Sequence, residues 1–195
     1  MFNTYPRTME DDVVDTAPWL SAAQAEDWKA LAAMLSALSA ALDAQLKRDA
    51  GMNLFEYHVL VALSECPGGV LAMTDLARVA QGSPSRLSHA VSRLERAGWV
   101  RRIECTEVGR RTSAILTDAG TAKLRAAAPG HVREVRRLVV DALTPEQLAG
   151  MGRAARAIVR RAAPEVAGLL GVEACGEDDV AAWSRAAPDV SRSPA

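Results

Sequence analysis

Apolar residues recur with a helical period over the N-terminal part of this chain. Between residues 21 and 50 they fall at alternating spacings of three and four, at Trp28, Leu31, Leu35, Leu38 and Leu42. Ser21-Ala22-Ala23-Gln24 predicts a capping box at the start of this helix, and Gly51 predicts its end. The stripe predicts packing against other helices, either of the same chain or of a second copy.

The middle of the chain predicts shorter elements. Asn53 and Glu56 form a second capping-box pattern, which opens a helix that ends at Pro67-Gly68-Gly69. Residues 70–72 are long enough only for a short strand, and residues 73–80 predict a short helix. A tight turn at Gln81-Gly82 leads directly into another helix. Two short helices joined in this way predict a helix-turn-helix.

The second helix of this pair has two chemically different faces. Ser83 predicts its N-cap, Pro84 its first turn and Gly98 its end. Leu87, Val91 and Leu94 define an apolar side at helical spacing. The rest of the surface carries hydroxyl, guanidinium and imidazole groups, from Ser85, Arg86, Ser88, His89, Ser92, Arg93 and Arg96. Such groups bind phosphates and base edges, so we interpret this as a DNA-recognition helix; the alternative is an ordinary capped surface helix.

A hairpin follows the helix. Residues 99–105 and 112–117 read as strands, and the Gly-containing loop between them carries Arg110 and Arg111. From Pro84 to Arg111 there are seven arginines and three glutamates, a local charge of +4 in a chain whose formal net charge is −1. A basic hairpin after a helix-turn-helix predicts a wing that reaches DNA, although these arginines could instead be solvated loop residues.

Composition supports a mainly helical fold. Hydrophobic residues make up 49% of the chain but aromatic residues only 4%, so Leu, Ala and Val must build the core. We therefore predict a mainly α protein with a small β-hairpin wing: a winged helix-turn-helix with N- and C-terminal dimerisation helices. The predicted boundaries are a flexible acidic arm at 1–18, a domain at 19–163 and a tail at 164–195. Within the domain, the winged helix covers about 53–117, and the dimerisation helices cover about 19–50 and 118–163.

Several motifs together resemble the MarR family of transcriptional regulators. They are Thr74-Asp75-Leu76-Ala77, Ser85-Arg86-Leu87-Ser88-His89, the run from Arg93 to Arg102, Gly109-Arg110 and Leu116-Thr117-Asp118-Ala119-Gly120. The resemblance spans Trp19 to Ala163. It implies a homodimer that binds a pseudo-palindromic double-stranded DNA operator, usually as a repressor, with affinity often relieved by a small phenolic ligand or an oxidant.

The resemblance also assigns residues. By position, the family's recognition-helix contacts fall on Ser85, Arg86, Ser88, His89 and Arg93, and its wing arginine on Arg110. The acidic residue that commonly precedes the wing Gly-Arg is Val108 here, so a carboxylate that steadies Arg110 must come from elsewhere, such as Glu107. With the residues added by helix geometry, the predicted DNA-binding set is Ser83, Ser85, Arg86, Ser88, His89, Ser92, Arg93, Arg110 and Arg111.

The C-terminal part predicts two more helices. Thr117 caps one that extends to about residue 142, with Pro129-Gly130 expected to kink or break it. Thr144, Pro145 and Gln147 combine a cap, a first-turn proline and a capping glutamine, which predicts the next helix. The terminal helices carry more apolar surface than a winged helix can cover, so dimerisation through them is expected. A pocket for a small aromatic ligand is expected near Trp28, Tyr57, His58 and His131.

Other function classes have weaker signals. The three cysteines, Cys66, Cys105 and Cys175, contain no C-x-x-C pair, and a cysteine-based redox sensor is one alternative, with Cys105 beside two arginines as the better candidate thiol. A winged helix used only for protein contact is another. No phosphate-binding loop, metal-ligand spacing or nucleophile–base motif is recognisable, so we expect neither an enzyme nor a bound metal or cofactor. No stretch resembles a secretory signal or membrane span, which predicts a cytoplasmic protein without membrane contact.

Overall fold

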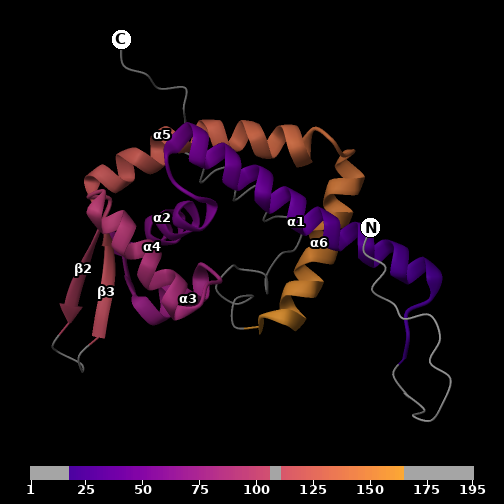
Figure 1. Cartoon of the computed structure of the whole chain (residues 1–195), viewed down its shortest axis with the longest axis horizontal. Coiled ribbons are helices and arrows are strands. Elements are labelled where there is room, and N and C mark those ends of the chain that lie inside the picture. Colours follow the sequence, from indigo (N-terminus) through magenta and orange to yellow (C-terminus); the bar gives the residue numbers. More distant parts are fainter. Residues whose placement is uncertain (1–17, 106–110, 165–195) are drawn as a thin grey trace. The chain divides into compact units, whose positions relative to one another are not determined.

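The computed structural model describes residues 18–105 and 111–164 (Figure 1). The chain divides into two compact units, and the boundary between them falls within the first helix, between Ala37 and Leu38. The elements, in chain order, are α1 (Ala22–Ala50), α2 (Leu54–Glu65), a 3-10 turn (Pro67–Gly69), β1 (Val70–Ala72), α3 (Met73–Val79), α4 (Pro84–Arg96), β2 (Val100–Cys105), β3 (Arg111–Leu116), α5 (Asp118–Val135), a π-helical turn (Arg136–Val140) and α6 (Pro145–Ala162). This confirms the mainly helical fold with a small sheet.

The helices begin at the residues that the capping patterns predict. Ser21 and Gln24 exchange side-chain and backbone hydrogen bonds at the start of α1. The Asn53 amide oxygen accepts from the Glu56 backbone N–H at 2.8 Å, and the Glu56 carboxylate accepts from the Asn53 N–H at 2.8 Å. Thr144 and Gln147 repeat this capping box at α6. Each cap satisfies helix-terminal N–H groups that have no partner within the helix.

The sheet contains one more strand than the predicted hairpin. Its order is β1-β3-β2, and both pairings are antiparallel. β3 pairs with β2 from Leu116 opposite Val100 to Arg111 opposite Cys105, and with the short β1 through Ile115 opposite Val70. Figure 1 shows β2 and β3 side by side. The short strand predicted at residues 70–72 therefore protects one edge of β3.

The core lies in the second unit, around α2. α2 contacts α3, α4, α5 and β3, while α4 also contacts α3 and β2. The largest fully buried side chains are Leu46, Met52, Val59, Leu60, Leu63, Leu76, Leu87, Val91, Leu94 and Val100. Asp43 of α1 accepts a hydrogen bond from the backbone N–H of Leu54 at 2.9 Å, which ties α1 to the start of α2. This packing positions α4 on one side of the core.

The remaining helices leave apolar side chains in solvent. Trp28 and Leu35 of α1 are 52% and 54% exposed, and Ile158 of α6 is 51% exposed. α6 has no buried residue at all. Leu148, Met151 and Val159 of α6 are only half-buried, so this helix gains less from the hydrophobic effect than one with a fully buried face.

Of the two outcomes expected at Pro129-Gly130, a kink or a break, the structure excludes the break. α5 continues through Pro129 and is not broken there. A π-helical turn follows later, at Arg136–Val140, where the Asp141 N–H bonds the carbonyl of Arg136. A proline removes one N–H donor from a helix but does not end it when packing holds the flanking turns. The acidic arm, except for residue 18, and the tail beyond residue 164 lie outside the described residues.

Candidate nucleic-acid interface

α4 is built as its sequence predicts. The hydroxyl oxygen of Ser83 accepts from the backbone N–H of Arg86 at 3.2 Å, and Pro84 occupies the first turn, where its missing N–H costs nothing. Gly98 adopts a φ of 76°, the left-handed conformation that glycine tolerates best, and turns the chain from α4 into β2. The helix is therefore short and has well-defined ends.

The two faces of α4 meet different surroundings. Leu87, Ala90, Val91 and Leu94 are all buried, with exposures of 1% or less. Ser85, Ser88 and His89 are exposed on the opposite side. Burial of the apolar face fixes the rotation of the helix, so hydroxyl and imidazole groups point away from the core. This confirms the predicted division of the helix, while the base-reading role of these three residues stays a prediction.

The two arginines on one shoulder of α4 turn toward α2. The guanidinium of Arg86 lies 4.2 Å from the centroid of the Phe55 ring, within the range of a cation–π contact. Arg93, seven residues further on, donates from Nε to the carboxylate of Glu56, a side chain that is only 8% exposed. Both contacts hold α4 against α2. The sequence assigns both arginines to DNA; that assignment stays a prediction, because each has a partner within the protein here.

On the other shoulder, α4 is joined to β2. Glu95 forms an ion pair with Arg102 at 2.9 Å, and Ser92 accepts a hydrogen bond from the same guanidinium at 3.0 Å. The sequence alone did not predict this ion pair, because Glu95 entered only the local charge count and Arg102 was given no role of its own. The available signal was an acidic residue in an otherwise basic segment, seven positions before an arginine on a predicted strand.

The wing is described only at its base. Arg111 lies at the start of β3 and pairs through its backbone with Cys105, but the orientation of its side chain is not part of the described structure. Arg110, Glu107 and Val108 fall in the undescribed residues 106–110. The wing contacts assigned to Arg110 and Arg111 therefore stay predictions.

The predicted ligand residues are brought together in part. The ring centroids of Tyr57 on α2 and His131 on α5 lie 4.5 Å apart, and the ring centroids of Tyr57 and His58 lie 6.4 Å apart. Partial burial, and secondarily the charge of His58, lowers the pKa of His131. Burial followed by the charge of Arg86 lowers the pKa of His58, and burial raises that of Tyr57. Among the described residues, the buried Nδ1 atom of His131 has no hydrogen-bond partner. Trp28 belongs to the other unit of the chain.

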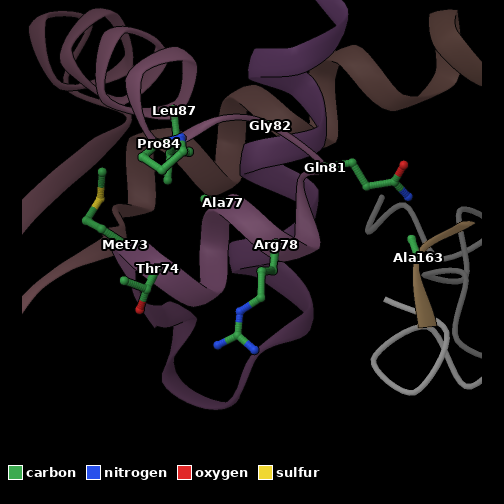
Figure 2. A pocket seen from close by; sticks show the side chains of 9 residues that line it. All are labelled: Met73, Thr74, Ala77, Arg78, Gln81, Gly82, Pro84, Leu87 and Ala163. Atoms are coloured by element: carbon green, nitrogen blue, oxygen red, sulfur yellow. The ribbon is translucent and has the colours of Figure 1, made fainter. Parts of the chain in front are cut away.

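A separate hollow of about 440 Å³ lies beside the turn between α3 and α4. Figure 2 shows residues of the helix-turn-helix on one side and Ala163 on the other. Its lining residues are Met73, Thr74, Ala77, Arg78, Gln81, Gly82, Pro84, Leu87 and Ala163. The hollow is mostly apolar and includes neither Tyr57 nor His131, so it differs from the predicted ligand site.

Within residues 18–105 and 111–164, no cluster of three or more His, Cys, Asp or Glu residues is arranged to hold a metal ion. Over the same part of the chain, no helix has the length and apolar character needed to cross a bilayer. Cys66 is a free, half-buried thiol, whereas the Cys105 side chain and Cys175 are not described.

The helix-turn-helix, the antiparallel sheet beside it and the exposed polar face of α4 define the class: a winged helix-turn-helix DNA-binding protein.

The comparisons with known proteins identify the family. The profile of the MarR family matches residues 50–111. Sco3205, a MarR family transcriptional regulator from Streptomyces coelicolor solved in complex with DNA, is 47% identical over 73% of this chain and 92% of its own, with a TM-score of 0.70. AbsC, a MarR family transcriptional regulator from the same organism, is 35% identical over 74% of this chain and 97% of its own, with a TM-score of 0.69. The chain therefore belongs to the MarR family and is a DNA-binding transcriptional regulator.

A more distant likeness shows the shared fold alone. The organohalide-sensing regulator RdhR-CbdbA1625, solved in its 2,4-dichlorophenol-bound form, is 17% identical over 78% of this chain and 90% of its own, with a TM-score of 0.64. No curated protein matches the chain significantly.

Proposed function

We propose that this regulator is a homodimer that represses transcription by occupying a pseudo-palindromic operator. The exposed face of α4 reads base edges in the major groove, chiefly through Ser85, Ser88 and His89. The wing arginines Arg110 and Arg111 contact the adjacent backbone or minor groove. Phosphate contacts set the register and base contacts set the sequence preference.

The observation that carries this proposal is the orientation of α4. Its apolar residues are buried, whereas Ser85, Ser88 and His89 are exposed on a face that carries no Lys or Glu. The solvent face of a helix that binds nothing more often mixes Lys and Glu. Sco3205, which is 47% identical, was solved in complex with DNA, and this supports DNA as the partner of the present chain.

Exposed apolar residues support the dimer. α6 has no fully buried residue, and Trp28, Leu35, Val132 and Ile158 are each at least half exposed. A second copy that covers these faces would supply the missing burial, at about 25 cal/mol for each Å² of apolar surface removed from water. Two-fold symmetry would then place two α4 helices in successive major grooves, roughly 10 base pairs apart.

Fluorescence anisotropy tests the DNA-binding part. The intergenic DNA beside the protein's own gene is compared with an unrelated duplex at physiological salt, and we expect a specific preference of roughly a thousandfold or more. His89→Ala should lower specific affinity by roughly 5- to 150-fold, the equivalent of about 1–3 kcal/mol for one base contact. Arg110→Ala should also weaken binding to the operator. Arg125→Ala, which removes one charge from an exposed position on α5, is its control and should not. Equal binding of both duplexes by the wild-type protein would contradict sequence-specific recognition.

Sedimentation tests the dimer. The wild-type protein should sediment as a dimer and bind its operator with two copies per duplex. Leu35→Glu places a charge within the exposed stripe of α1 and should shift the population toward monomer, whereas Lys29→Glu on the same helix should not. A wild-type protein that stays monomeric on the operator would refute the proposed symmetry.

We also propose that a small aromatic ligand regulates DNA binding. The specific observation is the Tyr57–His131 ring pair beside the buried Nδ1 of His131, which has no hydrogen-bond partner within the described part of the chain. A buried polar atom without a partner is costly, and a ligand hydroxyl could pair with this one. Titration of the protein–DNA complex with 2,4-dichlorophenol should release the duplex, and His131→Phe should raise the concentration required. Release that is unchanged in His131→Phe would place the ligand elsewhere.

The cytoplasmic location and the absence of catalysis stay predictions from the sequence.

A further inference from the structure

Arg102 on β2 makes an unusual number of contacts with the recognition helix. Its backbone N–H donates to Oε1 of Glu95 at 2.9 Å, and its Nη1 donates to Oε2 of the same carboxylate at 2.9 Å. Its Nη2 donates to the backbone oxygen of Ser88 at 2.9 Å and to Oγ of Ser92 at 3.0 Å. The Arg102 and Glu95 side chains are 28% and 34% exposed, so solvent screens this pair only in part.

The three partners of Arg102 lie along one side of α4. Ser88, Ser92 and Glu95 are spaced by four and three residues, which aligns them over two helical turns. One planar guanidinium therefore spans much of the helix, because its fork of fixed N–H donors reaches several acceptors at once. A lysine ammonium offers a single nitrogen and cannot reproduce this geometry.

The same contacts change the role of Ser92. Its hydroxyl donates to the carbonyl of Ser88 at 2.9 Å and accepts from Arg102. A hydroxyl has one hydrogen, so Ser92 has no donor left for a base edge. Its neighbours Ser85, Ser88 and His89 have no such side-chain partner among the hydrogen bonds of the described residues.

The turn that joins α4 to β2 explains why such a connection matters. The chain passes from Arg96 to Val100 through Gly98, which has a φ of 76°. Apart from its two chain neighbours, no atom of the described residues lies within 4 Å of the position that a Cβ would take there. β2 pairs with β3 along its whole length, and Arg111 begins β3. Any swing of the hairpin about this turn would therefore move the wing arginines relative to α4.

We propose that Arg102 is a positioning residue for operator recognition. Its hydrogen bonds to Glu95, Ser92 and Ser88 fix the angle between α4 and the hairpin. At this angle, α4 and the wing can contact the same DNA duplex. This inference rests on the proposed DNA-reading function of α4. Arg102 acts through the helix and the hairpin, and its own guanidinium contacts no DNA.

The test compares Arg102→Gln and Arg102→Lys with Arg101→Gln. Arg101 is the exposed neighbour on the same strand, so its substitution removes the same charge and leaves the hydrogen bonds of Arg102 in place. For each protein, anisotropy gives the affinity for the operator and for an unrelated duplex over a range of salt concentrations. Circular dichroism checks that each variant is folded at the assay temperature.

We expect Arg102→Gln to reduce the ratio of specific to non-specific affinity by roughly tenfold or more, the scale of one lost base contact. Arg102→Lys should fail to restore the ratio, and Arg101→Gln should leave it unchanged. Loss of a phosphate contact lowers the slope of log affinity against log salt by about one, so the slope for Arg102→Gln should match that for wild type. Glu95→Gln removes the carboxylate while keeping the side-chain shape, and should lower the ratio in the same direction.

The opposing results are distinct. Full restoration by Arg102→Lys, or a salt slope lowered by about one, would overturn the inference in favour of a simple phosphate contact. Unchanged ratios in Arg102→Gln and Glu95→Gln, with a wild-type protein that discriminates between the duplexes, would overturn this inference alone. If Arg102→Gln proves unfolded, the result for Glu95→Gln decides. A wild-type protein that does not discriminate overturns the proposed function as well.

Discussion

Gly82→Ala should destabilise the protein through a single buried ring. Gly82 precedes the cap of α4, and a Cβ added there would stand 2.3 Å from Cζ and 2.6 Å from Cε2 of Phe55. Phe55 is only 6% exposed, so its ring has little room to move away. The same ring carries the guanidinium of Arg86, and a shift would disturb the first turn of the recognition helix.

The expected magnitude follows from the cost of overpacking. Forcing one extra methyl group into a packed site costs about 1–3 kcal/mol. For a chain of this size, each kcal/mol lowers the melting temperature by roughly 2–4 °C, so Gly82→Ala should melt about 2–12 °C below wild type. Thermal unfolding followed by circular dichroism measures this difference. Protein concentration must be equal in all samples, because dimerisation makes the melting temperature concentration-dependent.

A double-mutant cycle with Phe55→Leu tests the mechanism. Phe55→Leu alone should destabilise the core, but it also removes the atoms that the new Cβ would meet. Gly82→Ala should therefore cost much less in the Phe55→Leu background than in wild type. Equal costs in the two backgrounds, or a Gly82→Ala protein as stable as wild type, would refute the reasoning from this contact.

Two further predictions concern α2 and the histidine on α5. Asn53→Ala removes the capping box of α2 and should lower the free energy of unfolding in denaturant by about 0.5–2 kcal/mol, whereas Asn53→Asp should retain most of it; equal losses in both would contradict a cap. Burial lowers the pKa of His131 below that of the unfolded chain, so its neutral form stabilises the fold above pH about 6.5, and this contribution is lost as pH falls through the lowered value. The midpoint of denaturant unfolding should fall more steeply below that pH in wild type than in His131→Gln, and parallel pH profiles would contradict the prediction.

Much of the fold could be predicted because its signals are local. The caps at Asn53, Ser83 and Thr144 need only a side chain and a backbone N–H three residues apart. The buried face of α4 follows from apolar spacing alone, since rotation of an amphipathic helix is set by which residues avoid water. Pro129 shows the limit of such reasoning, because the residue alone predicted either a kink or a break, and α5 continues through it.

What the exposed groups of α4 contact could not be deduced in this way. Arg93 and Glu56 are 37 residues apart in sequence, and only the packing of α4 on α2 brings them together. Arg102 reaches α4 because β2 folds back beside it after Gly98, and β1 pairs with β3 although Val70 and Ile115 are 45 residues apart in sequence. The sequence by itself determined the helices, their ends and their apolar faces, because those depend on interactions within a turn or two. The tertiary structure decided which polar groups pair with one another and which face solvent, because side chains far apart in sequence meet only after the core has packed.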